Sequence, residues 1–281
     1  MITGDPLFSI ENRIIAITGA GGGLMGVVAR GLAQRGARLA LLDINSAGVA
    51  ELADEICCQG GVAKSFHCDV VNEESVRIAL KAIQEQIGKP NGLINGAGGN
   101  NPSGSTSLEF MDPVDSDLSD TFFNIDLSGY QETNDLNYLG TVVCSKVFGP
   151  DITEADDGSI INISSMAAFV PLTKVPAYSA AKSAVSNFTH WLAVHLSRTG
   201  TRVNAIAPGF FMTEQLRYLH INQKTGEFTE RAKKVINATP FRRYGEPEEL
   251  VGVLVWLLSS SSQFVTGTVI PVDGGFSSYS I

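Results

Sequence analysis

Short apolar runs alternate with longer amphipathic stretches along most of the chain. Each short run ends in glycine, proline or a polar residue, and each longer stretch repeats its apolar residues at helical spacing. A short continuous apolar run of this kind is typical of a strand buried on both faces of a parallel sheet. Strands are predicted at residues 13–18, 38–42, 62–68, within 91–98, 159–163, 202–207 and 267–272, and helices at 27–35, 46–59, 73–87, 130–148, 178–197 and from 246.

Successive strand–helix units predict an α/β protein. Parallel strands are joined by crossover helices, so we expect one doubly wound parallel sheet with helices on both faces. The pattern shows no internal repeat and no second domain, and we therefore expect a single domain over residues 1–281.

The first predicted strand runs directly into a glycine-rich turn, Thr18-Gly-Ala-Gly-Gly-Gly-Leu-Met-Gly26. Gly21, Gly23 and Gly26 have the spacing Gly-x-Gly-x-x-Gly. Glycines let the backbone approach a pyrophosphate, and the N-terminus of the following helix faces its negative charge. A glycine match alone is weak evidence, but the order strand, turn and helix predicts a dinucleotide site on a Rossmann-type sheet.

The second predicted strand ends at Asp43. A carboxylate at this position can accept hydrogen bonds from the ribose hydroxyls of the adenosine and would repel a 2′-phosphate. Lysine and arginine do not occur at residues 20–26 or 44–46, where a phosphate clamp would lie. These features favour NAD(H) over NADP(H), although a strand-end acid can also simply face water.

A tyrosine and a lysine, Tyr178 and Lys182, lie four residues apart on a predicted helix. They share one helix face, where the ammonium would lower the pKa of the phenol and make it a general acid or base. Ser165 follows the strand at 159–163, and its hydroxyl can hold a substrate oxygen. An isolated pair of this kind is more often a surface tyrosine beside a solvated lysine. Here Ser165 and the glycine turn favour the catalytic interpretation.

The composition excludes several classes of partner. The 281 residues carry a net charge of −9, which argues against nucleic acid and anionic membranes. The four cysteines lack metal-ligand spacing, so we expect reduced thiols and no metal site. The first residues lack a basic segment followed by an apolar one, and we expect neither a secretory signal nor a membrane span, and hence a cytoplasmic protein.

A polar segment at 99–120, rich in Asn, Ser, Asp, Gly and Pro, predicts a long loop. It leaves the carboxyl end of a central strand, where ligands bind in such sheets. Asn100 and Asn101 are therefore candidates for contact with a polyhydroxylated substrate. A surface excursion or an oligomer contact is an equal alternative.

The constellation of Ser165, Tyr178 and Lys182, with Asn137 upstream, resembles the short-chain dehydrogenase/reductase family over almost the whole sequence. The turn departs from the family pattern Thr-Gly-x-x-x-Gly-x-Gly, because Met25 occupies the last glycine position. Residues 95–98 match the segment Asn-Asn-Ala-Gly, except that Gly96 replaces the second asparagine.

The resemblance implies a role for each matching residue. Tyr178 would donate the proton, Ser165 would orient the carbonyl oxygen, Lys182 would contact the nicotinamide ribose and Asn137 would hold a relay water. It also implies a mobile lid at 214–241 and a homo-oligomer, a dimer or a tetramer. The expected cofactor contacts are Gly19, Gly22, Gly23, Leu24, Met25, Asp43, Ile44, Asp69, Val70, Asn95, Gly96, Ala97, Tyr178, Lys182, Pro208, Gly209, Phe211 and Thr213.

Longer segments resemble one subgroup of that family, the D-mannonate oxidoreductases, also called fructuronate reductases. The similar segments are residues 95–100, 171–178, 187–195, 207–215 and 276–279. The implied reaction is D-fructuronate with NADH to D-mannonate with NAD. The alternatives are gluconate 5-dehydrogenase or another polyol dehydrogenase of the family, and, in another class, a non-catalytic dinucleotide sensor.

The substrate of such an enzyme carries a carboxylate, which needs a local cation in a protein of negative net charge. Lys174 is the leading candidate, because Pro171 and Pro176 restrict the backbone around it four residues before Tyr178. Arg217 on the expected lid is the second candidate. A solvated surface lysine is an equal alternative for Lys174.

Overall fold

The computed structural model describes residues 5–112, 117–223 and 225–280 of the chain. Within these residues seven strands form one parallel sheet in the order β3-β2-β1-β4-β5-β6-β7. The predicted α/β fold with a doubly wound parallel sheet is therefore confirmed. The strands are β1 (Ile14–Thr18), β2 (Arg38–Asp43), β3 (Val62–His67), β4 (Gly92–Asn95), β5 (Ser159–Ile163), β6 (Arg202–Pro208) and β7 (Val269–Val272).

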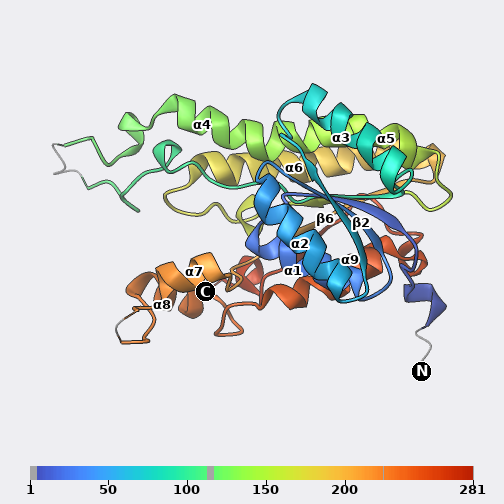
Figure 1. Cartoon of the computed structure of the whole chain (residues 1–281). Helices are drawn as coiled ribbons and strands as arrows, with labels where there is room; N and C mark the ends of the chain where they lie inside the picture. Colours follow the sequence, from blue (N-terminus) through green and yellow to red (C-terminus); the bar gives the residue numbers. More distant parts are fainter. Residues whose placement is uncertain (1–4, 113–116, 224, 281) are drawn as a thin grey trace.

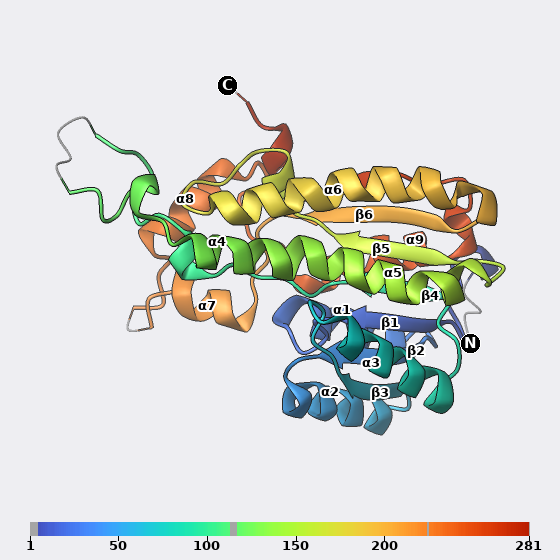
Figure 2. The ribbon, with the colours of Figure 1, turned by 90° about the horizontal axis from the view of Figure 1, so that it is seen from above.

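Helices cover both faces of this sheet (Figures 1 and 2). One face packs against α1 (Gly23–Ala33), α2 (Ser46–Cys58) and α9 (Val251–Leu258). The opposite face packs against α3 (Glu73–Gln86), α5 (Gly140–Thr153) and α6 (Pro176–Leu196). The other helices are α4 (Leu127–Asn134), α7 (Glu214–His220) and α8 (Glu230–Ala238).

The continuous apolar runs are explained by two hydrophobic cores, one on each face of the sheet. Ile15 and Ile17 of β1 belong to the core that contains α1 and α9. Ala16, between them, belongs to the core that contains α5 and α6. Successive side chains of a strand point to opposite faces, so a strand covered on both faces needs apolar residues at every position.

The strand order reverses between β1 and β4, which places the loops after these two strands side by side. In a sheet of this kind ligands bind at the carboxyl ends of the strands, at such a switch point. Figure 2 shows α7, α8 and the long loop before α4 beyond this end of the sheet. A ligand site is therefore expected here, between these elements and the glycine turn after β1.

An ionic cluster of two buried arginines and the half-buried Asp157 lies at the opposite end of the sheet. Asp157 accepts from the Nη1 of Arg13 at 2.5 Å and from the Nη2 of Arg202 at 3.0 Å. Both arginines are buried; the Nη2 of Arg13 also donates to the Asn91 carbonyl oxygen, and the Nη1 of Arg202 to that of Leu257. Because one carboxylate compensates two buried guanidinium groups, this cluster fixes the starts of β1 and β6 relative to each other.

Several helix boundaries differ from the predicted ones. Helix α1 begins at Gly23, because the glycine turn itself supplies the first helical turn with Gly22 as its N-cap. The helix predicted at 130–148 is divided into α4 and α5 by a π-helical segment, Asp135–Leu139. Helix α6 begins at Pro176, whose fixed φ and missing N–H suit the first turn of a helix.

Candidate active site

Ser165, Tyr178 and Lys182 are brought together by β5 and α6. Ser165 follows the carboxyl end of β5, where its Oγ accepts a hydrogen bond from the Ala167 N–H at 3.1 Å. The Tyr178 hydroxyl is hydrogen-bonded to the Ser165 side chain. Lys182 lies one helical turn further along α6, with its Nζ 5.6 Å from the centre of the Tyr178 ring. The structure thus assembles the predicted catalytic group.

Burial sets the pKa values of both titratable side chains. It raises the pKa of Tyr178 above its ordinary value, while the hydrogen bond from Ser165 acts in the opposite direction. It lowers the pKa of Lys182 to about 8. Each change favours the uncharged form, as expected for a group removed from water. The expectation that Lys182 lowers the Tyr178 pKa is therefore wrong. The buried Lys182 Nζ donates to the Ile163 carbonyl oxygen at 2.8 Å, and burial disfavours its own charged form.

Asn137 is fully buried in the π-helical segment between α4 and α5. Its Nδ2 donates to the carbonyl oxygens of Gly99 at 2.6 Å and Thr133 at 2.7 Å, and its Oδ1 accepts from the Gly99 N–H at 3.2 Å. One amide side chain thus holds both backbone groups of Gly99. π-Helical segments occur often at functional sites, and this one lets Asn137 reach the loop after β4.

The first turn of α1 has the features of an anion site. Gly21, Gly22 and Gly23 are exposed, and no described side chain caps the helix at Gly22. The free N–H groups of an uncapped first turn attract a phosphate. Thr213, at the start of α7, closes one side: a Cβ atom at Gly23 would lie 3.1 Å from the Thr213 Cβ.

The Asp43 carboxylate lies beside this turn. Its Oδ2 accepts from the Gly21 N–H at 2.9 Å, and its Oδ1 accepts from the Asn45 N–H at 2.9 Å. The strand-end acid is therefore not simply facing water, since it braces the glycine turn against the start of α2. Ile44, the next residue, is 66% exposed and is available to cover a flat ligand.

Thr18, which was not predicted to belong to the site, joins the ends of β1 and β4. Thr18 Oγ1 accepts from the N–H groups of Gly96 and Ala97, both at 3.1 Å. Gly19 has φ +67°, and a Cβ atom there would lie 2.7 Å from the Ala97 Cα. The position of Thr18 directly before the glycines was the only sequence signal for this contact.

Two expected cofactor residues have buried side chains. Asn95 is 2% exposed and donates through Nδ2 to Ser145 Oγ at 3.0 Å and to Asn162 Oδ1 at 2.8 Å. The Phe211 side chain is 4% exposed and packs on Gly245. Each side chain is held within the protein interior, so the predicted contact of these residues with the cofactor would have to come from their backbone.

The other expected cofactor residues lie around the switch point. Pro208 and Gly209 end β6, and a Cβ atom at Gly209 would lie 2.7 Å from the Asp273 Cα. Val70 is buried against Gly140, and the Asp69 Oδ1 accepts from the Val71 N–H at 3.1 Å.

The candidate substrate residues are less closely assembled. The half-buried Lys174 adopts φ +70°, a backbone conformation that a lysine rarely takes. Its carbonyl oxygen accepts from the Thr106 N–H at 2.9 Å, which ties the long loop to this turn. The Asn100 Nδ2 donates to Ser105 Oγ at 2.9 Å, and the exposed Arg217 lies 4.0 Å from Glu214. No contact in the described residues links Arg217 to Tyr178.

The arrangement can be compared with known proteins. A family model described as enoyl-(acyl carrier protein) reductase matches residues 19–277. An uncharacterized oxidoreductase of Haemophilus influenzae is 46% identical over 273 residues, covering 97% of this chain and 95% of the relative. The protein belongs to the short-chain dehydrogenase/reductase family.

Solved structures agree with this family assignment. The structure of a candidate D-mannonate oxidoreductase from Haemophilus influenzae with bound NAD has a TM-score of 0.92 and 46% identity, and 97% of each chain is covered. A gluconate 5-dehydrogenase from Burkholderia cenocepacia in complex with NADP and tartrate has a TM-score of 0.81 and 27% identity, covering 98% of this chain and 99% of the other.

The expected lid at 214–241 is flanked by two stretches that hydrogen-bond to each other. Met212 N donates to the Gly245 carbonyl oxygen at 2.8 Å, and Gly245 N donates to that of Phe210 at 2.9 Å. His220 lies within the 214–241 segment, and its Nδ1 is 2.8 Å from the hydroxyl of Tyr244, which follows the segment. The segment also has an internal contact, in which Thr229 N donates to the His220 carbonyl oxygen at 2.9 Å, and it contacts the end of the sheet where Phe241 N donates to the Gly274 carbonyl oxygen at 3.2 Å.

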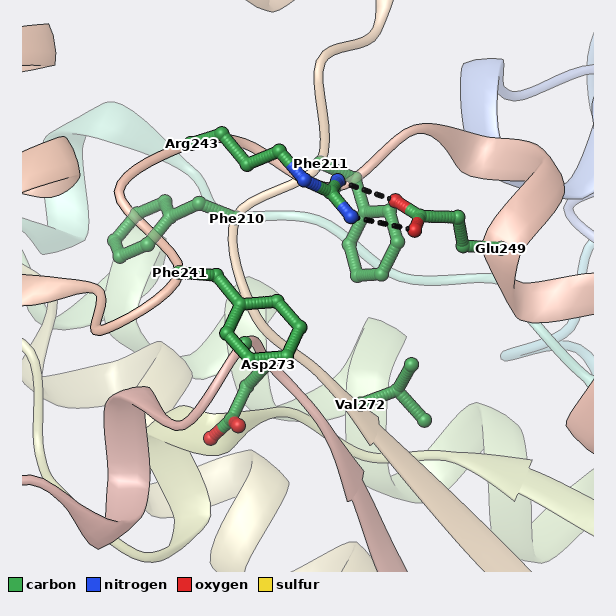
Figure 3. A pocket seen from close by; sticks show the side chains of 9 residues that line it. Phe210, Phe211, Phe241, Arg243, Glu249, Val272 and Asp273 are labelled. Carbon is green, nitrogen blue, oxygen red and sulfur yellow. Dashed lines mark hydrogen bonds and ion pairs between the residues drawn. The ribbon is translucent and has the colours of Figure 1, made fainter.

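Figure 3 shows the pocket at these two stretches, where the Arg243 guanidinium forms two hydrogen bonds with the Glu249 carboxylate. Phe210, Phe211 and Phe241 line it. Ser165, Tyr178 and Lys182 are not among the residues that line this pocket, so the pocket is distinct from the predicted catalytic group. None of the described helices is long and apolar enough to cross a membrane.

Proposed function

We propose that this short-chain dehydrogenase/reductase is an NAD(H)-dependent enzyme that reduces the ketone of a sugar acid, and that its reaction is D-fructuronate to D-mannonate. The observation that carries the proposal is the assembled Ser165–Tyr178–Lys182 group in a sheet whose first helix, α1, has an uncapped N-terminus. The 46% identity to a structure named as a candidate D-mannonate oxidoreductase with bound NAD supports the choice of cofactor and substrate.

The residues at the switch point fit a dinucleotide. The N–H groups of Gly22 and Gly23 would face the pyrophosphate, and Asp43 would accept from the ribose hydroxyls. Its negative charge would also disfavour the 2′-phosphate of NADP. The bound nicotinamide would supply the hydride for reduction of the ketone carbon.

The catalytic side chains would handle the oxygen and its proton. Ser165 Oγ would donate a hydrogen bond to the ketone oxygen and orient it. Tyr178 would transfer its phenolic proton to that oxygen as it gains negative charge. A phenol is protonated at neutral pH, and burial raises the pKa of Tyr178 further, so Tyr178 has the form that reduction requires. Lys182 would contact the nicotinamide ribose, and Asn137 would hold a water that relays protons to solvent.

The long loop and Lys174 would recognise the substrate. The left-handed backbone of Lys174 is stabilised by the Thr106 N–H, and strain of this kind gathers at functional sites. We propose that the Lys174 ammonium binds the sugar carboxylate and that Asn100 contacts a hydroxyl. Arg217 is the second candidate for the carboxylate.

A panel of uronates, ketogluconates and neutral ketoses, assayed by the loss of NADH absorbance, tests the function. We expect D-fructuronate to give the highest catalytic efficiency. Lys174→Met should lower that efficiency for charged substrates about tenfold to a hundredfold and spare neutral ketoses. Arg217→Met tests the second candidate for the carboxylate and should have a smaller effect. An equal loss on charged and neutral ketones would contradict the role of Lys174.

A second candidate is reduction of 5-ketogluconate. The similarity to a gluconate 5-dehydrogenase favours it, although the identity is 27%. Both substrates carry a carboxylate, so the catalytic group and Lys174 serve either one. A higher catalytic efficiency for 5-ketogluconate than for D-fructuronate in the same panel would establish this candidate instead.

We also propose a homo-oligomer. The outer face of α6 exposes Trp191 by 57% and Val194 by 76%, and Trp191 stacks on Phe188 and His195. An exposed aromatic stripe of this kind is typical of a protein interface. Light scattering coupled to gel filtration would measure the number of subunits, and a monomer would contradict the proposal.

A further inference from the structure

Two residues that depart from the family pattern touch each other. A Cβ atom at Gly96 would lie 2.5 Å from Met25 Cγ and 2.6 Å from Met25 Sδ. These separations are far below van der Waals contact, so the Met25 side chain occupies the space that any larger residue at position 96 would need. Met25 is 3% exposed and belongs to the core that includes α1 and β1.

The contact lies at the start of the loop that follows β4. There the N–H groups of Gly96 and Ala97 donate to Thr18 Oγ1 at 3.1 Å. Gly96 does not have a positive φ, so an alanine there would be strained by its neighbours rather than by its backbone. The Met25 side chain and Thr18 therefore both hold the first two residues of this loop.

Two residues further along the same loop, Gly98 lies against the predicted catalytic lysine, Lys182. A Cβ atom at Gly98 would lie 2.6 Å from Asn137 Oδ1 and 3.2 Å from Lys182 Nζ. Asn137 then holds the next residue, Gly99, through both backbone groups. A shift of the loop at Gly96 must consequently displace groups that pack directly on Lys182 and Asn137.

We propose that Met25 is a positioning residue of the dinucleotide site, acting through Gly96 on the loop at residues 96–99. It lies in the first turn of α1, the turn that faces the pyrophosphate, and its side chain supports the loop that packs on Lys182. Met25 thereby sets the distance between the phosphate end and the catalytic end of the site. The inference rests on the proposed binding of NAD(H).

The test measures the dissociation constant for NADH by calorimetry and the melting temperature, for the wild type and four single variants. Met25→Ala should weaken NADH binding on the order of tenfold, whereas the similarly sized Met25→Leu should stay within about twofold. Leu32→Ala is the matched control, since Leu32 is a fully buried residue at the other end of the same helix. It should lower the melting temperature and leave the NADH affinity unchanged. Gly96→Ala should weaken binding by at least as much as Met25→Ala.

The double variant Met25→Ala/Gly96→Ala decides whether the two residues act as a pair. Adding Gly96→Ala should cost less affinity in the Met25→Ala protein than in the wild type, because the Met25 side chain no longer obstructs the new methyl group. The rescue should be partial, since the Thr18 carbonyl oxygen would still lie 2.8 Å from that methyl group.

Three outcomes would overturn the inference. They are an equal loss of affinity in Met25→Ala and Leu32→Ala, a loss in Met25→Leu as large as in Met25→Ala, and an effect of Gly96→Ala that is the same in both backgrounds. Failure of the wild-type protein to bind NADH would instead overturn the proposed function, and the positioning role with it.

Discussion

Replacing Asp43 with alanine would change two properties of the site together. The carboxylate would accept from the ribose and repel a 2′-phosphate, so its loss should relax the preference for NADH. It also accepts from the N–H groups of Gly21 and Asn45, each at 2.9 Å. Asp43→Ala should therefore loosen the glycine turn that serves both cofactors.

The magnitude follows from these contacts. A hydrogen bond to a charged group contributes about 1.5–3 kcal/mol, and the partial exposure of Asp43 favours the lower value. Loss of a ribose contact and of the Gly21 contact should together cost about 3 kcal/mol, or roughly a hundredfold in catalytic efficiency with NADH. With NADPH the loss of repulsion offsets much of this cost, so efficiency should change about tenfold or less.

The assay compares catalytic efficiency with NADH and NADPH on the best ketone of the substrate panel. Asn45→Ala is the matched control. The Asn45 side chain caps α2 by accepting from the Gly48 N–H at 3.2 Å, and its loss should cost about 1 kcal/mol of stability without changing the ratio of the two cofactors.

Two results would refute this reasoning. A wild-type preference for NADPH would show that Asp43 does not select the cofactor. An Asp43→Ala protein that keeps full efficiency with NADH would show that neither the ribose nor the glycine turn depends on the carboxylate.

Three further predictions concern other side chains. Tyr178→Phe should bind NADH as the wild type does and lose about 10²–10⁴-fold in turnover; near-normal turnover would contradict the proton transfer. Burial lowers the pKa of Lys182 to about 8, so the unfolded protein binds this proton more strongly. The free energy of unfolding of the wild type, relative to that of Lys182→Met, should therefore rise by on the order of 3 kcal/mol as pH increases from about 8 to 10.5. Urea titrations measure this difference, and a difference that does not change with pH would contradict the burial of the charge. Asp157→Asn should cost about 3 kcal/mol of stability in the same titrations and leave the NADH affinity unchanged, because Asp157 lies at the opposite end of the sheet; an unchanged midpoint would show that it does not compensate the two arginines.

Much of the fold could be predicted from the residues alone. Buried parallel strands need apolar residues at every position, so runs such as 159–163 mark the strands without any knowledge of their neighbours. The glycine turn, Asp43 and the Tyr178–Lys182 pair are likewise local, because their spacing along one turn or one helix already defines their relative placement.

Other features depend on residues that meet only in the folded sheet. The contact of Met25 with Gly96 joins the first turn of α1 to the end of β4, and the burial of Asn95 depends on Asn162 of the neighbouring strand. The pKa of Tyr178 likewise follows from the burial that surrounding elements impose.

The sequence by itself therefore determined the strands, the order of the motifs and the residue types of the site. Periodicity and motif spacing are short-range properties, because they depend only on residues that are close together along the chain. The tertiary structure alone decided the left-handed backbone of Lys174, the support of the β4 loop by Met25 and the direction of the Tyr178 pKa. Each of these depends on sheet register and on the packing of distant segments, because the free volume and solvation of a side chain are properties of the neighbours that folding brings to it.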